Sequence, residues 1–268
     1  MPPAKKRTRS YDPARTRTAV LAQFGNVRQA VRTLDAHHLA LPTRLGDWTV
    51  RDLLAHLALT VGSVSRALER DEPAKPGTAL LDHPATTAAH ADAVAEEARV
   101  LAEATPDLGA LGALLTRTAR DLARDLDDAP PTRVLALRAG AMNLTDYLVT
   151  RTVELVVHTD DLNAAVPGLD VPHDRQAFAA CTRLLADTLA AQAPGGSTEV
   201  RIPPYAVVQC VAGPRHTRGT PPHVVETDPL TWIRLATGRT VWQDAVADAK
   251  VSASGERADL GPYLPLMT

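Results

Sequence analysis

The chain has 268 residues, of which 45% are hydrophobic and 22% charged, a balance typical of a folded soluble protein. A formal net charge of -2 gives no general attraction to nucleic acid or anionic membranes, so we expect neither partner. The two cysteines, Cys181 and Cys210, are too few for a disulfide framework, which favours a cytoplasmic location. No apolar run approaches the roughly 20 residues of a membrane-spanning helix, so no span is predicted.

The N-terminal part of the sequence predicts helices with clear start signals. Residues 1–11 are basic and contain two prolines, which predicts a disordered tail rather than a nucleic-acid-binding arm. Asp12, with Pro13 at the first helical position, predicts a helix that runs to about residue 37. Thr49 and Asp52 have capping-box spacing and predict a second helix that ends near residue 70.

Residues 71–83 contain Pro73, Pro76 and Gly77 and predict an exposed crossover loop. The following segments are predicted as helices at 84–105, 107–127 and 143–165, with either a short strand or an extended connector at 134–138. Long helices that each carry one apolar stripe pack as bundles. Residues 12–166 contain four such stretches, the third of them broken in two at Pro106, and therefore predict an all-α four-helix bundle.

The pattern changes after Pro172. Alternating and continuous apolar runs predict strands that are interleaved with shorter helices. The expected helices are 173–193, 228–236 and 241–248, and the expected strands are 198–202, 205–212, 222–227 and 250–254. A turn is expected at 213–222, and a terminal turn or helix at 260–266. Residues 172–268 therefore predict a second, small α+β domain.

The segment 147–162, predicted as a helix, carries the chemistry that we single out. Glu154 and His158 are four residues apart, so their side chains leave the same helix face. Apolar residues surround them, and a buried carboxylate is costly unless something compensates its charge. A metal ion is one such compensator, and His56 is the best candidate for a third ligand. The alternatives are a simple helical side-chain pair and a hydrogen-bonded core histidine.

Two stretches of the sequence resemble the signatures of the mycothiol-dependent maleylpyruvate isomerase family. They are Trp48–Leu57, with Thr-Val-Arg-Asp before His56, and Leu144–Leu162, with an Arg, then Glu154, then His158 and Asp-Leu. The resemblance covers residues 12–166 and implies a DinB-like helical bundle. It also implies that His56, Glu154 and His158 bind a divalent metal ion, most often zinc, with mycothiol as the thiol cosubstrate.

The resemblance implies a mechanism and further candidate residues. A zinc ion with three protein ligands keeps one open position, where a thiol would lose its proton. The thiolate would then attack a small electrophile, which the sequence does not identify. Asp161 and Arg151 lie near the ligand face of the helix, so they either orient the metal site or form an ordinary surface ion pair.

The segments Thr227–Arg239 and Val251–Arg257 are similar to the sterol-carrier-like domain, a fusion common in actinobacteria. Glu256 stands where that family usually has Asp. Trp232, Leu235 and Trp242 are expected to form the core of this domain or, alternatively, to line a lipid site. Three functions remain: a metal- and thiol-dependent transferase or isomerase, a carrier of an apolar ligand, and a non-catalytic metal-binding protein. The sequence leaves the oligomeric state open.

Overall fold

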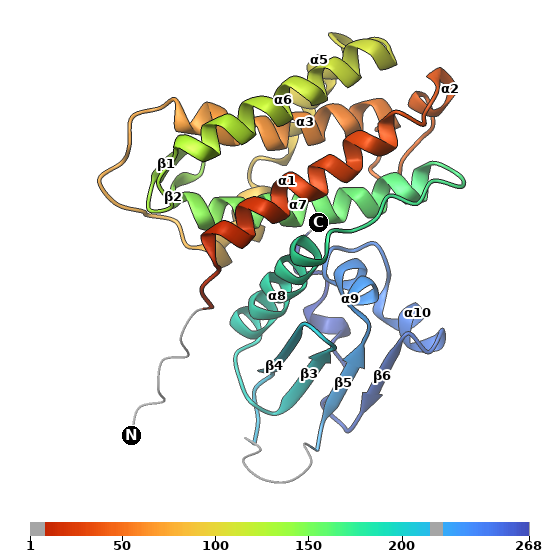
Figure 1. The fold of residues 1–268 in the computed structure, drawn as a ribbon. Helices are drawn as coiled ribbons and strands as arrows, with labels where there is room; N and C mark the ends of the chain where they lie inside the picture. Colours follow the sequence, from red (N-terminus) through yellow and green to blue (C-terminus); the bar gives the residue numbers. More distant parts are fainter. Residues whose placement is uncertain (1–8, 215–221, 268) are drawn as a thin grey trace.

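The computed structural model describes residues 9–214 and 222–267. A helical N-terminal region and a smaller C-terminal region of helices and a sheet pack together, with α7 against α8 (Figure 1). This is the expected order of a helical part followed by an α+β part. Residues 1–8 of the predicted tail and most of the predicted turn at 213–222 lie outside the described residues.

The helical region is larger than a simple four-helix bundle. Its elements are α1 (Pro13–Val31), α2 (Ala36–Leu39), α3 (Val50–Leu68), η1 (Leu80–Asp82), α4 (His83–Ala88), α5 (Ala91–Glu103), α6 (Leu108–Asp128), β1 (Val134–Leu137), β2 (Gly140–Asn143) and α7 (Leu144–Ala165). α3 packs against α5, α6 and α7, and α1 packs against α6 and α7. The four-helix prediction is therefore not confirmed in its exact form, because α2 is an additional short helix and the third predicted stretch forms the separate helices α4, α5 and α6.

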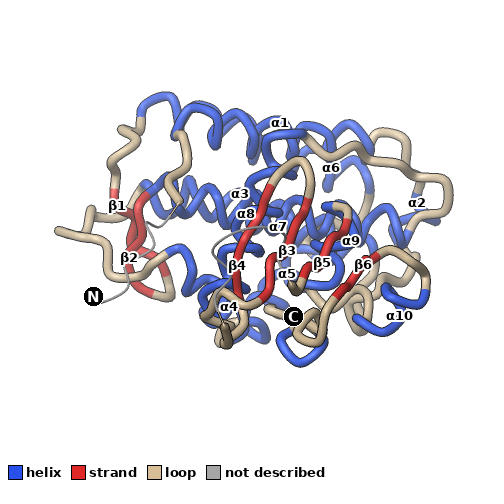
Figure 2. The backbone as a smooth tube through the Cα atoms, turned by 90° about the horizontal axis from the view of Figure 1, so that it is seen from below, coloured by secondary structure: helices blue, strands red, loops and turns tan. Residues whose placement is uncertain are grey.

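Several predicted boundaries shift. The first helix ends at Val31 because Asp35 caps the separate helix α2, accepting a hydrogen bond of 3.0 Å from the backbone N–H of His38. The predicted helix at 84–105 is divided into α4 and α5 at Ala89 and His90. Residues 134–138 contain a strand, β1, which pairs with β2 in a hairpin that lies apart from the four-stranded sheet (Figure 2).

The C-terminal region is a mixed sheet covered by helices. Its elements are α8 (Arg175–Gln192), β3 (Thr198–Ile202), β4 (Ala206–Cys210), β5 (Val224–Thr227), α9 (Pro229–Ala236), α10 (Trp242–Ala247), β6 (Val251–Ser254) and η2 (Gly261–Tyr263). The strand order is β4-β3-β5-β6, with β3 and β5 parallel and the other pairs antiparallel. Thr198, Val200 and Ile202 are buried while the residues between them are half-buried, so one face of β3 is turned into the core.

Helix α7 is buried on both sides because it belongs to two hydrophobic cores. Val149, Val153 and Val156 join the core that includes α8 and the sheet. Leu148, Leu155 and Leu162 join the core of the helical region. A charged side chain on such a helix has little access to water and needs a partner inside the protein. Within residues 9–214 and 222–267, no helix is both long and apolar enough to cross a bilayer.

Candidate metal centre

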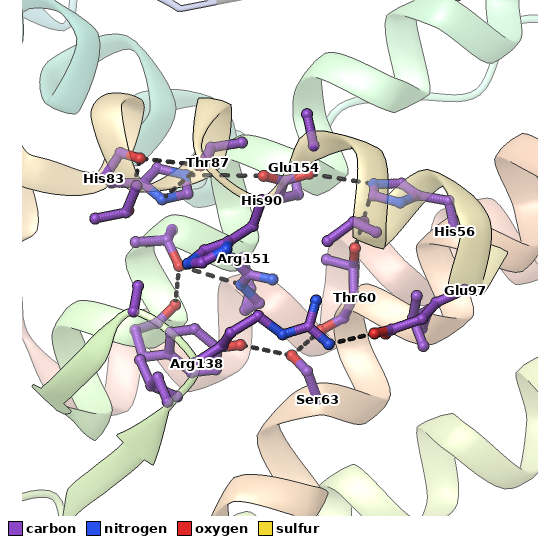
Figure 3. Close-up of a pocket in the computed structure, with 18 of the residues that line it drawn as sticks. His56, Thr60, Ser63, His83, Thr87, His90, Glu97, Arg138, Arg151 and Glu154 are labelled. Atoms are coloured by element: carbon purple, nitrogen blue, oxygen red, sulfur yellow. Dashed lines mark hydrogen bonds and ion pairs between the residues drawn. The ribbon is translucent and has the colours of Figure 1, made fainter.

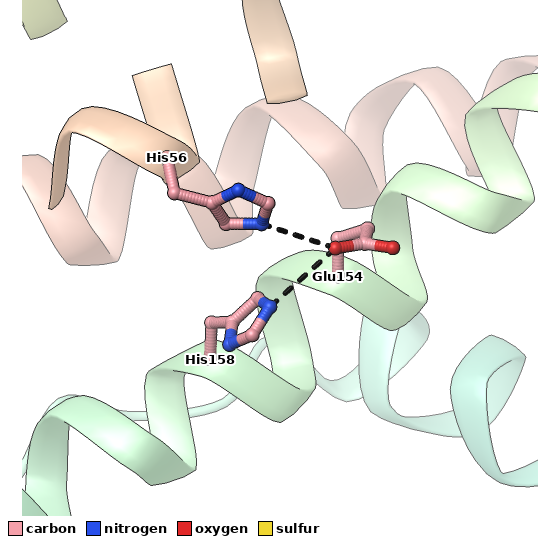
Figure 4. Close-up of side chains that lie close together, drawn as sticks. All are labelled: His56, Glu154 and His158. Atoms are coloured by element: carbon pink, nitrogen blue, oxygen red, sulfur yellow. Dashed lines mark hydrogen bonds and ion pairs between the residues drawn. The ribbon is translucent and has the colours of Figure 1, made fainter. Parts of the chain in front are cut away.

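The three residues expected to bind a metal lie together between α3 and α7 (Figure 4). Glu154 and His158 project from successive turns of α7, and His56 comes from α3. Glu154 Oε2 lies 3.3 Å from His56 Nε2 and 3.5 Å from His158 Nε2. One ligand atom from each residue lies within 4.8 Å of the other two. The fold therefore brings together residues that are about a hundred positions apart in the sequence.

The spacing of these atoms suits a small divalent ion. Ligand atoms about 2.0–2.1 Å from a tetrahedral zinc ion lie roughly 3.3–3.4 Å from one another, close to the two distances that involve Glu154 Oε2. Two imidazole nitrogens and one carboxylate oxygen are also a donor set found in catalytic zinc sites, whereas Ca²⁺ and Mg²⁺ prefer oxygen ligands. The residues present thus fit zinc in both distance and chemistry.

The centre carries buried negative charge. Burial would raise the pKa of Glu154, but hydrogen bonds with His158 and His56 and the charge of Arg151 hold that pKa well below its usual range. Burial lowers the pKa of His56. Burial acts in the same direction on His158, but hydrogen bonds to Asp161 and Glu154 outweigh it and raise its pKa. An ionised carboxylate next to two imidazoles is an environment that favours a cation.

Asp161 orients one of the two histidines. Its Oδ2 lies 2.8 Å from His158 Nδ1, and its side chain is fully buried. A proton on Nδ1 is held by this carboxylate, so Nε2 is left free to face Glu154. Carboxylate contacts of this kind fix the tautomer of metal-binding histidines in other proteins. The alternative of a surface ion pair is wrong for Asp161, because the carboxylate is not on the surface.

Arg151 lies in the wall of a cavity beside Glu154 (Figure 3). Its guanidinium carbon is 4.5 Å from the centre of the Tyr147 ring, and its Nε donates to Thr150 Oγ1 at 3.1 Å. These contacts hold the positive charge near the three candidate ligands. Its position in the wall therefore favours a role in the site over the alternative of a surface ion pair.

The cavity has a volume of about 500 Å³ and is lined by all three candidate ligands. α3, α4, α5, the β1–β2 hairpin and α7 form most of its walls, and Arg239 contributes from the C-terminal region. Apolar side chains such as Trp48 and Met142 alternate there with cationic ones such as Arg66. A pocket of this size with a few polar groups suits a small-molecule ligand.

Comparison with known proteins assigns the helical region. A family profile described as the mycothiol maleylpyruvate isomerase N-terminal domain matches residues 20–163, more than half of the chain. The chain belongs to this family. A second profile, described as a bacterial SCP ortholog, matches residues 174–266 and confirms the resemblance of the C-terminal region to sterol-carrier proteins. No curated protein matches the chain.

Two solved structures have the same fold as this chain. One is the mycothiol-dependent maleylpyruvate isomerase, with 16% identity and a TM-score of 0.60, covering 93% of this chain and 95% of the isomerase chain. The other is a histidine-to-alanine mutant of that isomerase, with 16% identity, a TM-score of 0.59 and the same coverage. The likeness extends over both regions, so the two-part architecture is shared as a whole.

A cluster of charges that no sequence pattern indicated joins the two regions of this family member. Asp160 on α7 pairs with Arg234 of α9 at 2.6 Å and also with Arg44. Asp161 pairs with Arg239 at 2.9 Å. Arg234 and Arg239 belong to the sterol-carrier-like region, so this region contacts the carboxylate that orients His158. In the sequence, Arg234 and Arg239 are marked only by their place in the segment Thr227–Arg239, which resembles the sterol-carrier-like domain.

His83 is a further residue of the site that sequence reasoning missed. The sequence placed it at the end of the crossover loop 71–83, which was predicted to be exposed. That prediction is wrong for the last residues of the loop, because Leu80 and His83 are only 6% and 5% exposed. His83 Nε2 lies 3.8 Å from Glu154 Oε1 (Figure 3). Burial lowers the pKa of His83 to about 4, so the ring is neutral at pH 7. Neither a motif nor a helical period marks this histidine in the sequence.

Proposed function

We propose that this chain is a metal- and mycothiol-dependent isomerase or transferase that acts on a small electrophile. The observation that carries the proposal is the convergence of His56, Glu154 and His158, whose ligand atoms lie within 4.8 Å of one another and line a cavity of about 500 Å³. Membership of the family supports mycothiol as the thiol. The name of the solved relative makes maleylpyruvate the first electrophile to test.

In this proposal His56, Glu154 and His158 would hold the ion, with zinc the best match to the donor set. When bound, a divalent ion supplies positive charge that favours the thiolate of a thiol near neutral pH. The protein's own residues prepare the site for this. Asp161 Oδ2 lies 2.8 Å from His158 Nδ1, and this contact keeps Nε2 of the same ring directed at the metal centre. The indole of Trp48 has its ring centre 5.2 Å from that of His56 and adds apolar surface beside the site.

Two arginines would favour a negatively charged molecule in the cavity. Arg151 is held against the ring of Tyr147, and Arg239 is held by Asp161. Both side chains line the cavity. A fixed positive charge stabilises negative charge that develops on a reacting molecule, more strongly where water is scarce. These arginines are therefore proposed to hold and polarise the electrophile while the thiol attacks it.

The alternative of an apolar-ligand carrier gains no support from the residues that suggested it. Trp232 and Leu235 are each 1% exposed, and the indole nitrogen of Trp232 donates to the backbone oxygen of Thr182 at 3.3 Å. Trp242 is also buried within the same core. These contacts are those of core packing, so the lipid-lining role is not proposed.

Elemental analysis and a turnover assay test the proposal together. The purified chain should hold close to one zinc ion, and it should convert maleylpyruvate only when mycothiol is present. Glu154→Gln removes the charge of one ligand at constant shape, and it should lose most of the metal and the turnover. Glu103→Gln, an exposed change on α5, should retain both. Metal uptake without turnover of this or a related electrophile would favour the non-catalytic alternative, and full metal retention by Glu154→Gln would contradict the site.

A further inference from the structure

His83 presents a buried nitrogen with no hydrogen-bond partner to the proposed metal centre. Its side chain is 7% exposed, and Nε2 is a buried side-chain atom without a partner. A buried polar group that makes no hydrogen bond is costly, so such an atom calls for an explanation. The carboxylate oxygen Glu154 Oε1 lies 3.8 Å from this nitrogen. Figure 3 shows His83 and His56 approaching Glu154 from opposite sides.

The two oxygens of Glu154 therefore face different partners. Oε2 faces Nε2 of both His56 and His158, at 3.3 and 3.5 Å. Oε1 faces only His83 among the ion pairs of the described residues. An ion bound at the three candidate ligands would take Oε2, and Oε1 would remain a buried, partly charged acceptor that needs a donor.

The carboxylate also decides which nitrogen of His83 carries the proton. A neutral imidazole has one N–H, and a lone pair directed at an anionic oxygen would be repelled. The proton is therefore favoured on Nε2, where it faces Oε1. The other nitrogen, Nδ1, is then an acceptor for the hydroxyl of Thr87, whose oxygen is 3.2 Å away. The same hydroxyl lies 3.0 Å from the backbone oxygen of His83, so its single hydrogen is shared between these two acceptors. Both ring nitrogens are satisfied by this arrangement once the gap of 3.8 Å closes by less than an ångström.

We propose that His83 is a positioning residue that donates a hydrogen bond from Nε2 to Glu154 Oε1 and so keeps Glu154 a ligand through Oε2 alone. This inference rests on the proposed metal site. A carboxylate that bound the ion through both oxygens would occupy a further coordination position. By holding Oε1 away from the ion, His83 preserves the open position that a thiol would need.

A role as a fourth ligand is not supported by the geometry. The ligand atoms of His56, Glu154 and His158 lie within 4.8 Å of one another, and the group defined in this way in the described residues does not include His83. His83 Nε2 lies 3.8 Å from Glu154 Oε1, slightly beyond hydrogen-bond distance. Oε1 is not the oxygen that faces the imidazoles of His56 and His158.

The test compares two substitutions of similar size. His83→Gln keeps an N–H donor at the position of Nε2, whereas His83→Met keeps the length and removes the donor. Zinc affinity of the metal-free chain, measured by competition with a chromophoric chelator, should fall about 10–100-fold in His83→Met and return to within a few-fold of the original in His83→Gln. As a control, His173→Met removes a half-buried histidine, which contacts the backbone oxygen of Val156 at 3.3 Å and lies outside the cavity. It should leave zinc affinity unchanged.

The visible spectrum of the cobalt-substituted protein gives a second measurement, which a general loss of stability would not change. If Glu154 binds through both oxygens in His83→Met, the visible absorption of bound Co²⁺ should weaken, because five-coordinate cobalt absorbs less than four-coordinate cobalt. Equal zinc affinity and equal cobalt spectra in the Met and Gln variants would overturn the role of His83 while leaving the metal site intact. Failure of the unsubstituted chain to bind zinc or cobalt would overturn both, and it would be seen before any variant is made.

Discussion

Asp161 shows how one carboxylate can serve two purposes at this site. It lies 2.8 Å from the candidate ligand His158 and 2.9 Å from Arg239, and its side chain is fully buried. Burial would raise the pKa of Asp161, but the hydrogen bond and charge of His158 and those of Arg239 hold it far below the usual range. Asp161 is therefore ionised across the pH range in which an enzyme works, and its charge adds to the pull of the site on a cation.

The substitution Asp161→Asn tests this contribution. The amide would keep the size and one acceptor oxygen but lose the charge, so zinc affinity should fall about 10–100-fold, the range for partners of metal-binding histidines. The measurement is competition with a chelator on the metal-free chain at neutral pH. Asp146→Asn on the same helix is the control, because Asp146 is half-buried and makes no hydrogen bond to a candidate ligand. Similar affinities for the two variants would contradict the assigned contact.

The candidate site could be predicted from sequence only where residues share a helix or a family signature. Glu154 and His158 follow from helical spacing, and Asp161 follows because it is one turn from His158. His56 was the best guess for a partner helix, and the resemblance strengthened it. His83 could not be found, because it lies in a segment without periodicity whose burial depends on how the crossover packs against α7.

At the scale of elements, capping residues were the most informative signals. Thr49 and Asp52 form the predicted capping box at the start of α3, with Asp52 Oδ2 accepting from the backbone N–H of Thr49 at 2.8 Å. Asp12 and Asp228 likewise cap α1 and α9 ahead of a proline. Helix ends were less predictable, as at Val31, because the apolar stripe of the segment continued through the break before α2.

The leucine face of helix α7 packs in the core of the helical region, and a single truncation can test its contribution to stability. Leu155 is fully buried in the core of the helical region, next to Glu154 in sequence. Leu155→Ala should lower the free energy of unfolding by about 2–5 kcal/mol, because it removes apolar contacts and leaves a cavity. Urea unfolding followed by circular dichroism measures this change. Val100→Ala on α5, where the side chain is 57% exposed, should change it by less than about 0.5 kcal/mol. An equally small effect at Leu155 would show that α7 is not a core helix.

For the whole molecule, the order of the two regions was predictable but their contact was not. The matched ranges 20–163 and 174–266 lie within the predicted units 12–166 and 172–268. Their docking depends on apolar residues of α7 that look like ordinary core positions, and on arginines from the C-terminal region that reach Asp160 and Asp161. Nothing in a single sequence shows which charges meet across an interface, because the partners lie on elements that are remote in the chain.

This charge cluster makes the docking of the two regions sensitive to acid. Burial would raise the pKa of Asp160, but hydrogen bonds from Arg234 and Arg44 lower it, and the pKa of Asp161 is lowered as well. A carboxyl group whose pKa is lower in the folded state than the unfolded value of about 3.9 stabilises the fold fully above that value. The contribution is lost as the pH falls below about 3.9 towards the folded pKa, because the unfolded chain then binds more protons.

The free energy of unfolding, measured with urea at a series of pH values, should therefore decline between about pH 5 and pH 2. Asp160→Asn removes one of the two titrating groups, so it should lower stability at pH 7 and make the decline shallower. The exposed change Asp92→Asn on α5 is the control and should leave the profile unchanged. A profile for Asp160→Asn that runs parallel to the original would show that Asp160 does not link the sterol-carrier-like region to α7 through its charge. The C-terminal region would then be held to α7 by its apolar contacts and by the pair of Asp161 and Arg239.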